Sequence, residues 1–142
     1  MIAVLLVTHG PVGENLVDTV ANMLGELALK TDIIEVARDD DPDERIAATQ
    51  QAAAALDQGD GVLVLTDAFG STPSNVANNA AQSVANQSNC RVVAGVNLPM
   101  LVRIYNYPKL GLEDMVASAV EAGRQGVMSC TSPQPPQKKN HA

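Results

Sequence analysis

The stretch IAVLLVTHGPVGENL, residues 2–16, begins with six consecutive aliphatic residues, and one residue later a histidine opens a glycine-rich turn. A half-exposed strand would alternate apolar and polar residues, so an unbroken run predicts a strand buried on both faces. Three further runs of strand length follow, at 32–37, 61–66 and 91–96. Strands of this kind are typical of a parallel sheet covered by helices on each side.

Helical patterns fill the segments between these runs. Residues 12–29 carry apolar side chains three and four positions apart, as an amphipathic helix does. Asp41 and Pro42 suit the N-cap and first position of a second helix, and Thr72 and Pro73 suit those of a third. The expected helices span 12–29, 42–56, 73–86, 97–107 and 111–126. The alternation predicts one doubly wound α/β domain with three layers, α/β/α.

The carboxy-terminal region is expected to end the domain at residue 130. Its last apolar segment, GVMSC at 126–130, is suited to a short final strand. Residues 131–142, TSPQPPQKKNHA, offer almost no apolar surface to offset the entropy of ordering. We therefore expect a domain over 1–130 and a disordered tail over 131–142.

Composition excludes several classes of function. The 142 residues carry a formal net charge of -7, which argues against a nucleic-acid partner because phosphate binding needs clustered Lys and Arg. No apolar run approaches the roughly 20 residues of a membrane span, and the first residues lack a signal-peptide pattern. A cytoplasmic protein without membrane insertion is expected. Cys90 and Cys130 have neither zinc-ligand nor redox spacing, and we expect no metal.

Polar residues gather where the strands end. Ligands of open α/β sheets bind at the carboxyl ends of the strands, and here those ends carry His9 and Asp67. If the first and third strands are neighbours, these two side chains lie side by side. A hydrogen bond from one ring N–H to the carboxylate would fix the tautomer and leave the other nitrogen as a base or nucleophile.

The loops after these strands are suited to an anion. Gly10 and the pair Ser71 and Thr72 precede helix N-termini, where free backbone N–H groups would face a phosphoryl group on His9. The alternatives are structural: His9 as a satisfied strand-end histidine, Asp67 as a turn cap, and both hydroxyls as helix caps. The chain lacks a P-loop, the GxGxxG order, and the acidic pair that a phospho-aspartate receiver needs.

Three motifs in the same order and spacing, THG at 8–10, TDAFGSTPSN at 66–75 and AGVNLPMLV at 94–102, resemble the IIA component of the mannose-family sugar phosphotransferase system. The resemblance covers about residues 2–130. It implies a cytoplasmic phosphotransferase without cofactor that accepts a phosphoryl group from the histidine of the carrier HPr. His9 then resembles the phosphorylated residue and Asp67 its carboxylate partner. A separate IIB component is the implied acceptor.

The resemblance also implies a fold and one departure from the family. The family sheet has strand order 2-1-3-4 and a last antiparallel strand exchanged within a homodimer, which GVMSC at 126–130 resembles. Ser71 stands where the family commonly has a second glycine, so the phosphate-binding loop would change if that position needs a positive φ. Two rival functions stay open: a regulatory phosphoprotein whose phosphorylation controls partner binding, and an inactive interaction domain.

Overall fold

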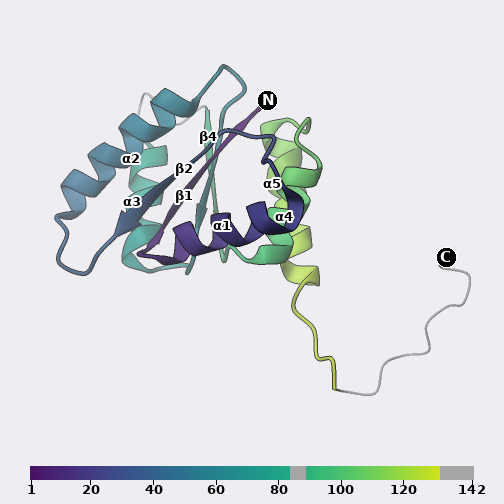
Figure 1. The fold of residues 1–142 in the computed structure, drawn as a ribbon. Coiled ribbons are helices and arrows are strands. Elements are labelled where there is room, and N and C mark those ends of the chain that lie inside the picture. Colours follow the sequence, from purple (N-terminus) through teal and green to yellow (C-terminus); the bar gives the residue numbers. More distant parts are fainter. Residues whose placement is uncertain (84–88, 132–142) are drawn as a thin grey trace, which may run out of the picture.

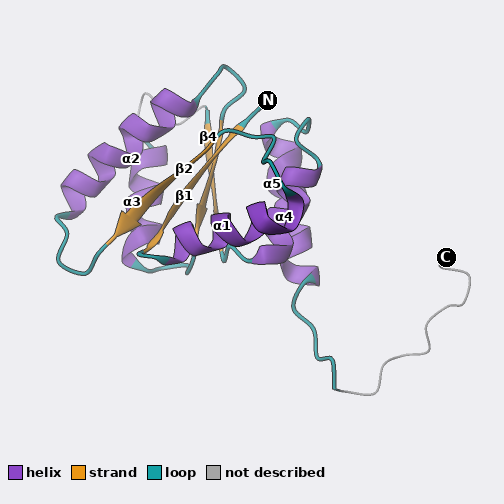
Figure 2. Cartoon of the chain, viewed as in Figure 1, coloured by secondary structure: helices purple, strands orange, loops and turns teal. Residues whose placement is uncertain are grey.

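The chain forms a sheet between two layers of helices (Figures 1 and 2). A computed structural model describes residues 1–83 and 89–131. The strands are β1 (Ala3–His9), β2 (Thr31–Val36), β3 (Val62–Thr66) and β4 (Cys90–Ala94). The helices are α1 (Val12–Leu24), α2 (Pro42–Leu56), α3 (Thr72–Ala81), α4 (Leu98–Asn106) and α5 (Leu112–Gln125). Helices α2 and α3 cover one face, and α1, α4 and α5 cover the other.

The sheet has the order β2-β1-β3-β4, with every neighbouring pair parallel. This confirms the expected three-layer fold and the strand order 2-1-3-4. In the register of the two central strands, Val7 lies opposite Thr66, and on the other side of β1, His9 lies opposite Val36. The carboxyl ends of β1 and β3 therefore meet at one edge of the sheet.

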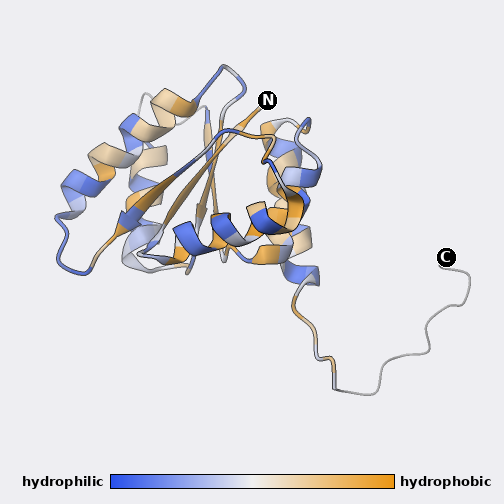
Figure 3. Cartoon of the chain, viewed as in Figure 1, coloured by the Kyte–Doolittle hydropathy of each residue, from blue (hydrophilic) through white to orange (hydrophobic). Residues whose placement is uncertain are grey.

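The two central strands are buried on both faces, as their unbroken apolar sequences predict. In β1, Val4 and Leu6 join the core beneath α1, α4 and α5, whereas Leu5 and Val7 join the core beneath α2 and α3. Figure 3 shows much of the sheet in hydrophobic colours and hydrophilic residues on the covering helices. Because both faces of β1 pack in a core, the strand has no face on which polar residues would be exposed to solvent.

The structure changes three of the expected helix boundaries. Helix α1 ends at Leu24, not at 29, because Gly25 adopts φ 85° and stops the helix. Ser71, and not Thr72, is the N-cap of α3, since its Oγ accepts the N–H of Ser74 at 3.4 Å. Helix α3 ends at Ala81, whereas the prediction continued it to 86; of that predicted stretch, residues 84–86 lie outside the described residues.

The expected final strand over 126–130 is not formed in this chain. Helix α5 ends at Gln125, and the residues after it leave the body of the domain (Figure 1), with Val127 77% and Met128 68% exposed. A strand needs another strand beside it for its ladder of backbone hydrogen bonds, and in residues 1–83 and 89–131 the sheet consists of β1 to β4 without this segment. The predicted tail falls outside the described residues from 132 onward.

None of the helices within residues 1–83 and 89–131 combines the length and the apolar content that crossing a membrane requires.

A partly buried hydrogen bond joins helix α4 to the start of β2, and the tyrosine that makes it renders stability sensitive to alkaline pH. The Tyr105 hydroxyl lies 2.6 Å from Thr31 Oγ1. Burial raises the pKa of Tyr105 to about 12, and the bond to Thr31 opposes that rise. The unfolded chain loses this proton near pH 10, before the folded one, so the free energy of unfolding falls between about pH 10 and 12.

We predict that Tyr105→Phe removes this pH dependence. We compare the free energy of unfolding of the wild type with that of the variant at pH 8.5 and at pH 11. Between these two pH values the wild type should lose about 1.4 kcal/mol more than the variant. The measurement is urea unfolding of both proteins at the two pH values. Tyr107→Phe is the matched control, because Tyr107 is exposed. An equal pH-dependent loss in all three proteins would contradict the prediction.

Candidate functional site

The carboxyl edge of the sheet brings His9 and Asp67 together. His9 is the last residue of β1, and Asp67 directly follows β3. His9 Nδ1 lies 2.8 Å from Asp67 Oδ2, and the backbone N–H of His9 donates to the same oxygen at 3.1 Å. The contact that the strand order predicts is therefore present, and it is doubled by a backbone hydrogen bond.

This contact fixes how the ring can react. An ionised carboxylate only accepts hydrogen bonds, so Nδ1 carries the proton and Nε2 of the neutral ring keeps its lone pair. The side chain of His9 is 52% exposed, whereas that of Asp67 is 14% exposed. Asp67 Oδ1 also accepts the N–H of Ala68 at 3.1 Å. An exposed imidazole is thus held by a carboxylate that is mostly buried and is itself bonded to the backbone.

His9 lies on the side of the sheet that α2 and α3 cover. Side chains alternate along a strand, and Leu5 and Val7 both pack in the core with residues of α3. Two residues further on, His9 continues the same face. The start of α3, where Ser71 and Thr72 lie, therefore belongs to the face on which the ring projects.

A buried clamp under His9 is a feature that the sequence analysis missed. Thr8 is fully buried; its Oγ1 accepts the N–H of Gly13 at 2.8 Å and donates to the carbonyl of His9 at 3.0 Å. A Cβ on Gly13 would lie 2.8 Å from Thr8 Oγ1 and 3.0 Å from Ile33 Cγ2. Glycine is thus required where the first turn of α1 crosses the end of β1. The sequence shows only a threonine at the end of a predicted strand, five residues before a glycine, and this pattern does not by itself distinguish the clamp.

The loop from Asp67 to α3 accommodates Ser71 without strain. The residue with positive φ is Gly70, at 82°, whereas Ser71 has φ -76°. The departure from the family pattern therefore falls at a position that any residue can adopt. Ser71 Oγ donates to the carbonyl of Ala68 at 2.6 Å, in addition to capping α3. Its hydroxyl is thus engaged within the loop.

Two further expected residues lie at the rim of the site. Gly10 follows His9, and a Cβ on it would lie 2.8 Å from Glu35 Oε2, so the turn packs closely under the glutamate of β2. Thr72 is the exposed first residue of α3. Both stand on segments that flank His9.

Residues 1–83 and 89–131 contain no group of three or more His, Cys, Asp and Glu side chains placed to hold a metal ion. Cys90 and Cys130 are both free thiols. Burial raises the pKa of Cys90, with Asp57 acting in the same direction, so this thiol stays protonated within the core.

Known proteins resemble this chain in sequence and in fold. The mannose-specific EIIAB component of the phosphotransferase system (PTS) from Escherichia coli (strain K12) is 34% identical over 128 residues, which is 89% of this chain and 38% of that protein. The chain thus spans well under half the length of this relative. The mannose/sorbose-specific IIA subunit from Enterococcus faecalis is 28% identical, with a TM-score of 0.73 over 95% of this chain and 98% of that one.

Other likenesses concern the fold and the family. A phosphotransferase system component EIIA from Streptococcus agalactiae superposes with a TM-score of 0.79 over 91% of this chain and 97% of that one, at 21% identity, which shows a shared fold. The profile of the EIIA-man family, described as the PTS system fructose IIA component, matches residues 3–120. The chain therefore belongs to the EIIA-man family of IIA components of the phosphotransferase system.

Proposed function

We propose that this chain is a phosphocarrier that accepts a phosphoryl group on His9 from an HPr-like donor. The observation that carries the proposal is the 2.8 Å contact between His9 Nδ1 and Asp67 Oδ2 beneath a half-exposed ring. In the transfer, the lone pair of Nε2 forms a bond to phosphorus while the N–P bond of the donor phosphohistidine breaks. The donor imidazole keeps the pair of electrons from the broken bond, so no other reactant is needed.

Asp67 is assigned the role of stabilising the phosphorylated ring. With a proton on Nδ1 and phosphorus on Nε2, the imidazole becomes cationic, and the carboxylate at 2.8 Å offsets that charge. The same carboxylate selects the tautomer that leaves Nε2 free. One acceptor oxygen thus serves both the free and the phosphorylated state.

Gly10, Ser71 and Thr72 are proposed to surround the phosphoryl group, with unequal parts. At the start of α3, Pro73 has no N–H, and the N–H of Ser74 is taken by Ser71 Oγ. The backbone N–H of Thr72 is then the donor at this helix start that is suited to a phosphoryl oxygen. Gly10 lets the turn after His9 lie close to Glu35, and Ser71 supports the loop through its bond to the carbonyl of Ala68.

The family membership supports the further steps of the proposal. We propose that phosphorylated His9 passes its phosphoryl group to a IIB component, as a phosphotransferase in sugar uptake, and that the protein works in the cytoplasm without a cofactor. The exposed ring supports transfer between proteins, because the reacting nitrogens of both partners must approach closely at a shared surface.

A homodimer is also proposed, supported by a groove beside the edge strand β4. The groove has a volume of about 490 Å³ and is lined by apolar residues of β4 and α5 together with Val127: Val92, Val93, Ala94, Val116 and Val120. Strand β4 pairs with β3 on one side and is the last strand of the described sheet, and an edge strand beside an apolar groove suits an added strand. The exposed segment 126–130 of a second subunit has the apolar residues to occupy it.

The nucleophile is tested by labelling the protein from phosphoenolpyruvate with enzyme I and HPr. We expect His9→Ala to abolish labelling without unfolding the protein, since the side chain lies at a strand end. Asp67→Asn should slow transfer on the order of 10²-fold, because it removes the charge that orients and stabilises the ring. The label should be stable in alkali and lost in acid, as an N–P bond is. Labelling that survives in His9→Ala would identify another nucleophile.

The clamp under His9 should affect the rate of transfer and not the binding of the donor. Thr8→Val keeps the shape but leaves the N–H of Gly13 and the carbonyl of His9 without the hydroxyl, so we expect kcat to fall about tenfold with KM for HPr unchanged. Thr8→Ser keeps the hydroxyl and should restore most of the rate. Equal kcat values for the two variants would show that the hydroxyl does not position His9.

The dimer is tested by truncation. A chain that stops after Gly126 keeps α5 complete but loses the proposed exchanged strand, and we expect it to be monomeric or to aggregate in light scattering at high micromolar concentration. A chain that stops after Thr131 is the matched control and should stay dimeric and active, because only the predicted tail is removed. A monomeric full-length protein would contradict the proposal.

A further inference from the structure

The single phenylalanine of the chain is presented to solvent beside the reactive histidine. Phe69 is 87% exposed and follows Asp67 by two residues. Scattered aliphatic residues are common on protein surfaces, but a ring this exposed at a functional site has a large apolar area available for a partner.

Hydrogen bonds of the backbone define the turn that carries this ring. The N–H of Ser71 donates to the carbonyl of Ala68 at 3.2 Å, which closes a four-residue turn with Phe69 and Gly70 at its centre. A glycine with positive φ at the third position is the pattern of a type II turn, and Gly70 has φ 82°. Ser71 Oγ donates to the same carbonyl, and Asp67 accepts the N–H of Ala68. A rigid turn loses little entropy when its tip is buried in a complex.

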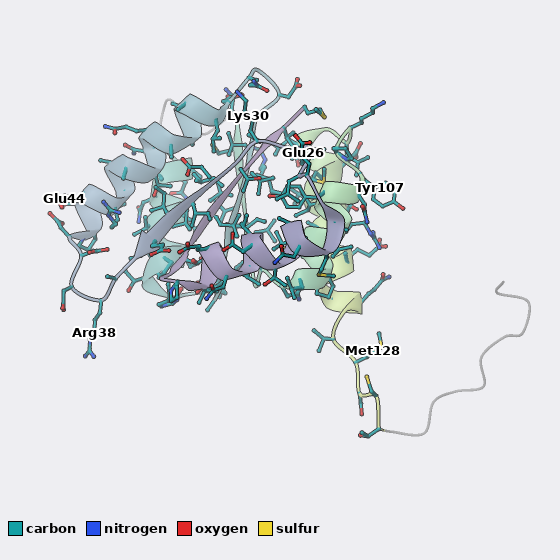
Figure 4. The ribbon with its side chains drawn as sticks, in the orientation of Figure 1. Glu26, Lys30, Arg38, Glu44, Tyr107 and Met128 are labelled. Atoms are coloured by element: carbon teal, nitrogen blue, oxygen red, sulfur yellow. The ribbon has the colours of Figure 1, made fainter. Side chains whose placement is uncertain are left out.

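The opposite flank of His9 is strongly acidic. Residues 35–45, EVARDDDPDER, carry six acidic and two basic side chains and run from the end of β2 into α2. Strand β2 pairs with β1 so that Val36 lies opposite His9, and the carboxylate of Glu35 lies against Gly10. Figure 4 shows Arg38 and Glu44 at this end of the molecule, with Tyr107 on the far side. The negative electrostatic potential of this acidic segment repels a polyanion and attracts a basic surface.

We propose that the Phe69 turn (68–71), the His9–Asp67 pair and the acidic segment 35–45 form one docking face for the phosphoryl donor protein. The inference rests on the proposed function and adds the chemistry of the partner: an apolar depression beside its phosphohistidine that receives Phe69, flanked by Lys or Arg side chains that face the acidic segment. The ring supplies most of the affinity, and the charges supply the rate and the orientation of encounter.

The experiment measures transfer from phospho-HPr to wild type and matched variants, with HPr concentration varied. Phe69→Ala should raise KM for HPr about tenfold and leave kcat within about twofold, because the ring touches the partner and not the reacting atoms. Tyr107→Ala, an exposed aromatic at the end of α4, should match wild type. Phe69→Tyr keeps the ring and should keep the low KM. All side chains exchanged are exposed, so thermal unfolding should be unchanged.

The acidic flank is tested by charge reversal in the same assay. Asp39→Lys should lower kcat/KM several-fold at low salt and less at 0.5 M salt, whereas Glu26→Lys, away from the site (Figure 4), should have little effect. If Phe69→Ala equals Tyr107→Ala and Asp39→Lys equals Glu26→Lys, while His9 is still labelled, the docking face is overturned and the phosphocarrier stands. If wild-type His9 takes no label from phospho-HPr, both are overturned.

Discussion

The parallel pairing of β1 with β3 is the interaction on which the site depends. Val7 lies opposite Thr66 in that pairing, which places His9 and Asp67 just past the last paired residues of the two strands. A one-residue slip would turn every side chain of β1 to the other face and move the imidazole away from the carboxylate. Such a slip would exchange the side chains of β1 between the two cores and move Thr8 away from Gly13, so the packing of both cores and this hydrogen bond oppose it. Burial in the sheet thus fixes the geometry of the surface.

The sequence predicts this fold well where local and global requirements agree. Strands buried on both faces leave continuous apolar runs, and Pro42 and Pro73 mark two helix starts within a residue. The end of α1 was misplaced because Leu27 and Leu29 continue the helical spacing beyond Gly25. Leu29 is indeed buried, but from the connecting segment before β2. Periodicity reports that a leucine enters the core, and it does not report which backbone conformation carries the residue there.

The sequence predicts which residues form the candidate site, but it does not predict the hydrogen bonds that hold them in place. His9 and Asp67 each follow a buried strand, so strand order alone brings them together. The clamp of Thr8 and Gly13 depends instead on how closely α1 crosses the end of β1, a distance that no local pattern contains. In a sequence, a threonine within a strand looks like any other β-branched residue that favours strands, and only the hydrogen bonds in the structure distinguish its role. The conformation at Ser71 likewise became known from its φ angle.

Asp67 connects the chemistry to the surface that surrounds it. Its Oδ2 accepts both hydrogen bonds from His9, and its Oδ1 accepts the N–H of Ala68, the residue at which the turn carrying Phe69 begins. Loss of these hydrogen bonds to Asp67 would therefore disturb the imidazole of His9 and the turn that carries Phe69 together. The ring of Phe69, in contrast, is mostly exposed and can be altered without moving either hydrogen-bonded group. Phosphoryl transfer and docking thus both depend on Asp67, but they use different side chains, His9 and Phe69. For this reason kcat and KM can report on the two independently.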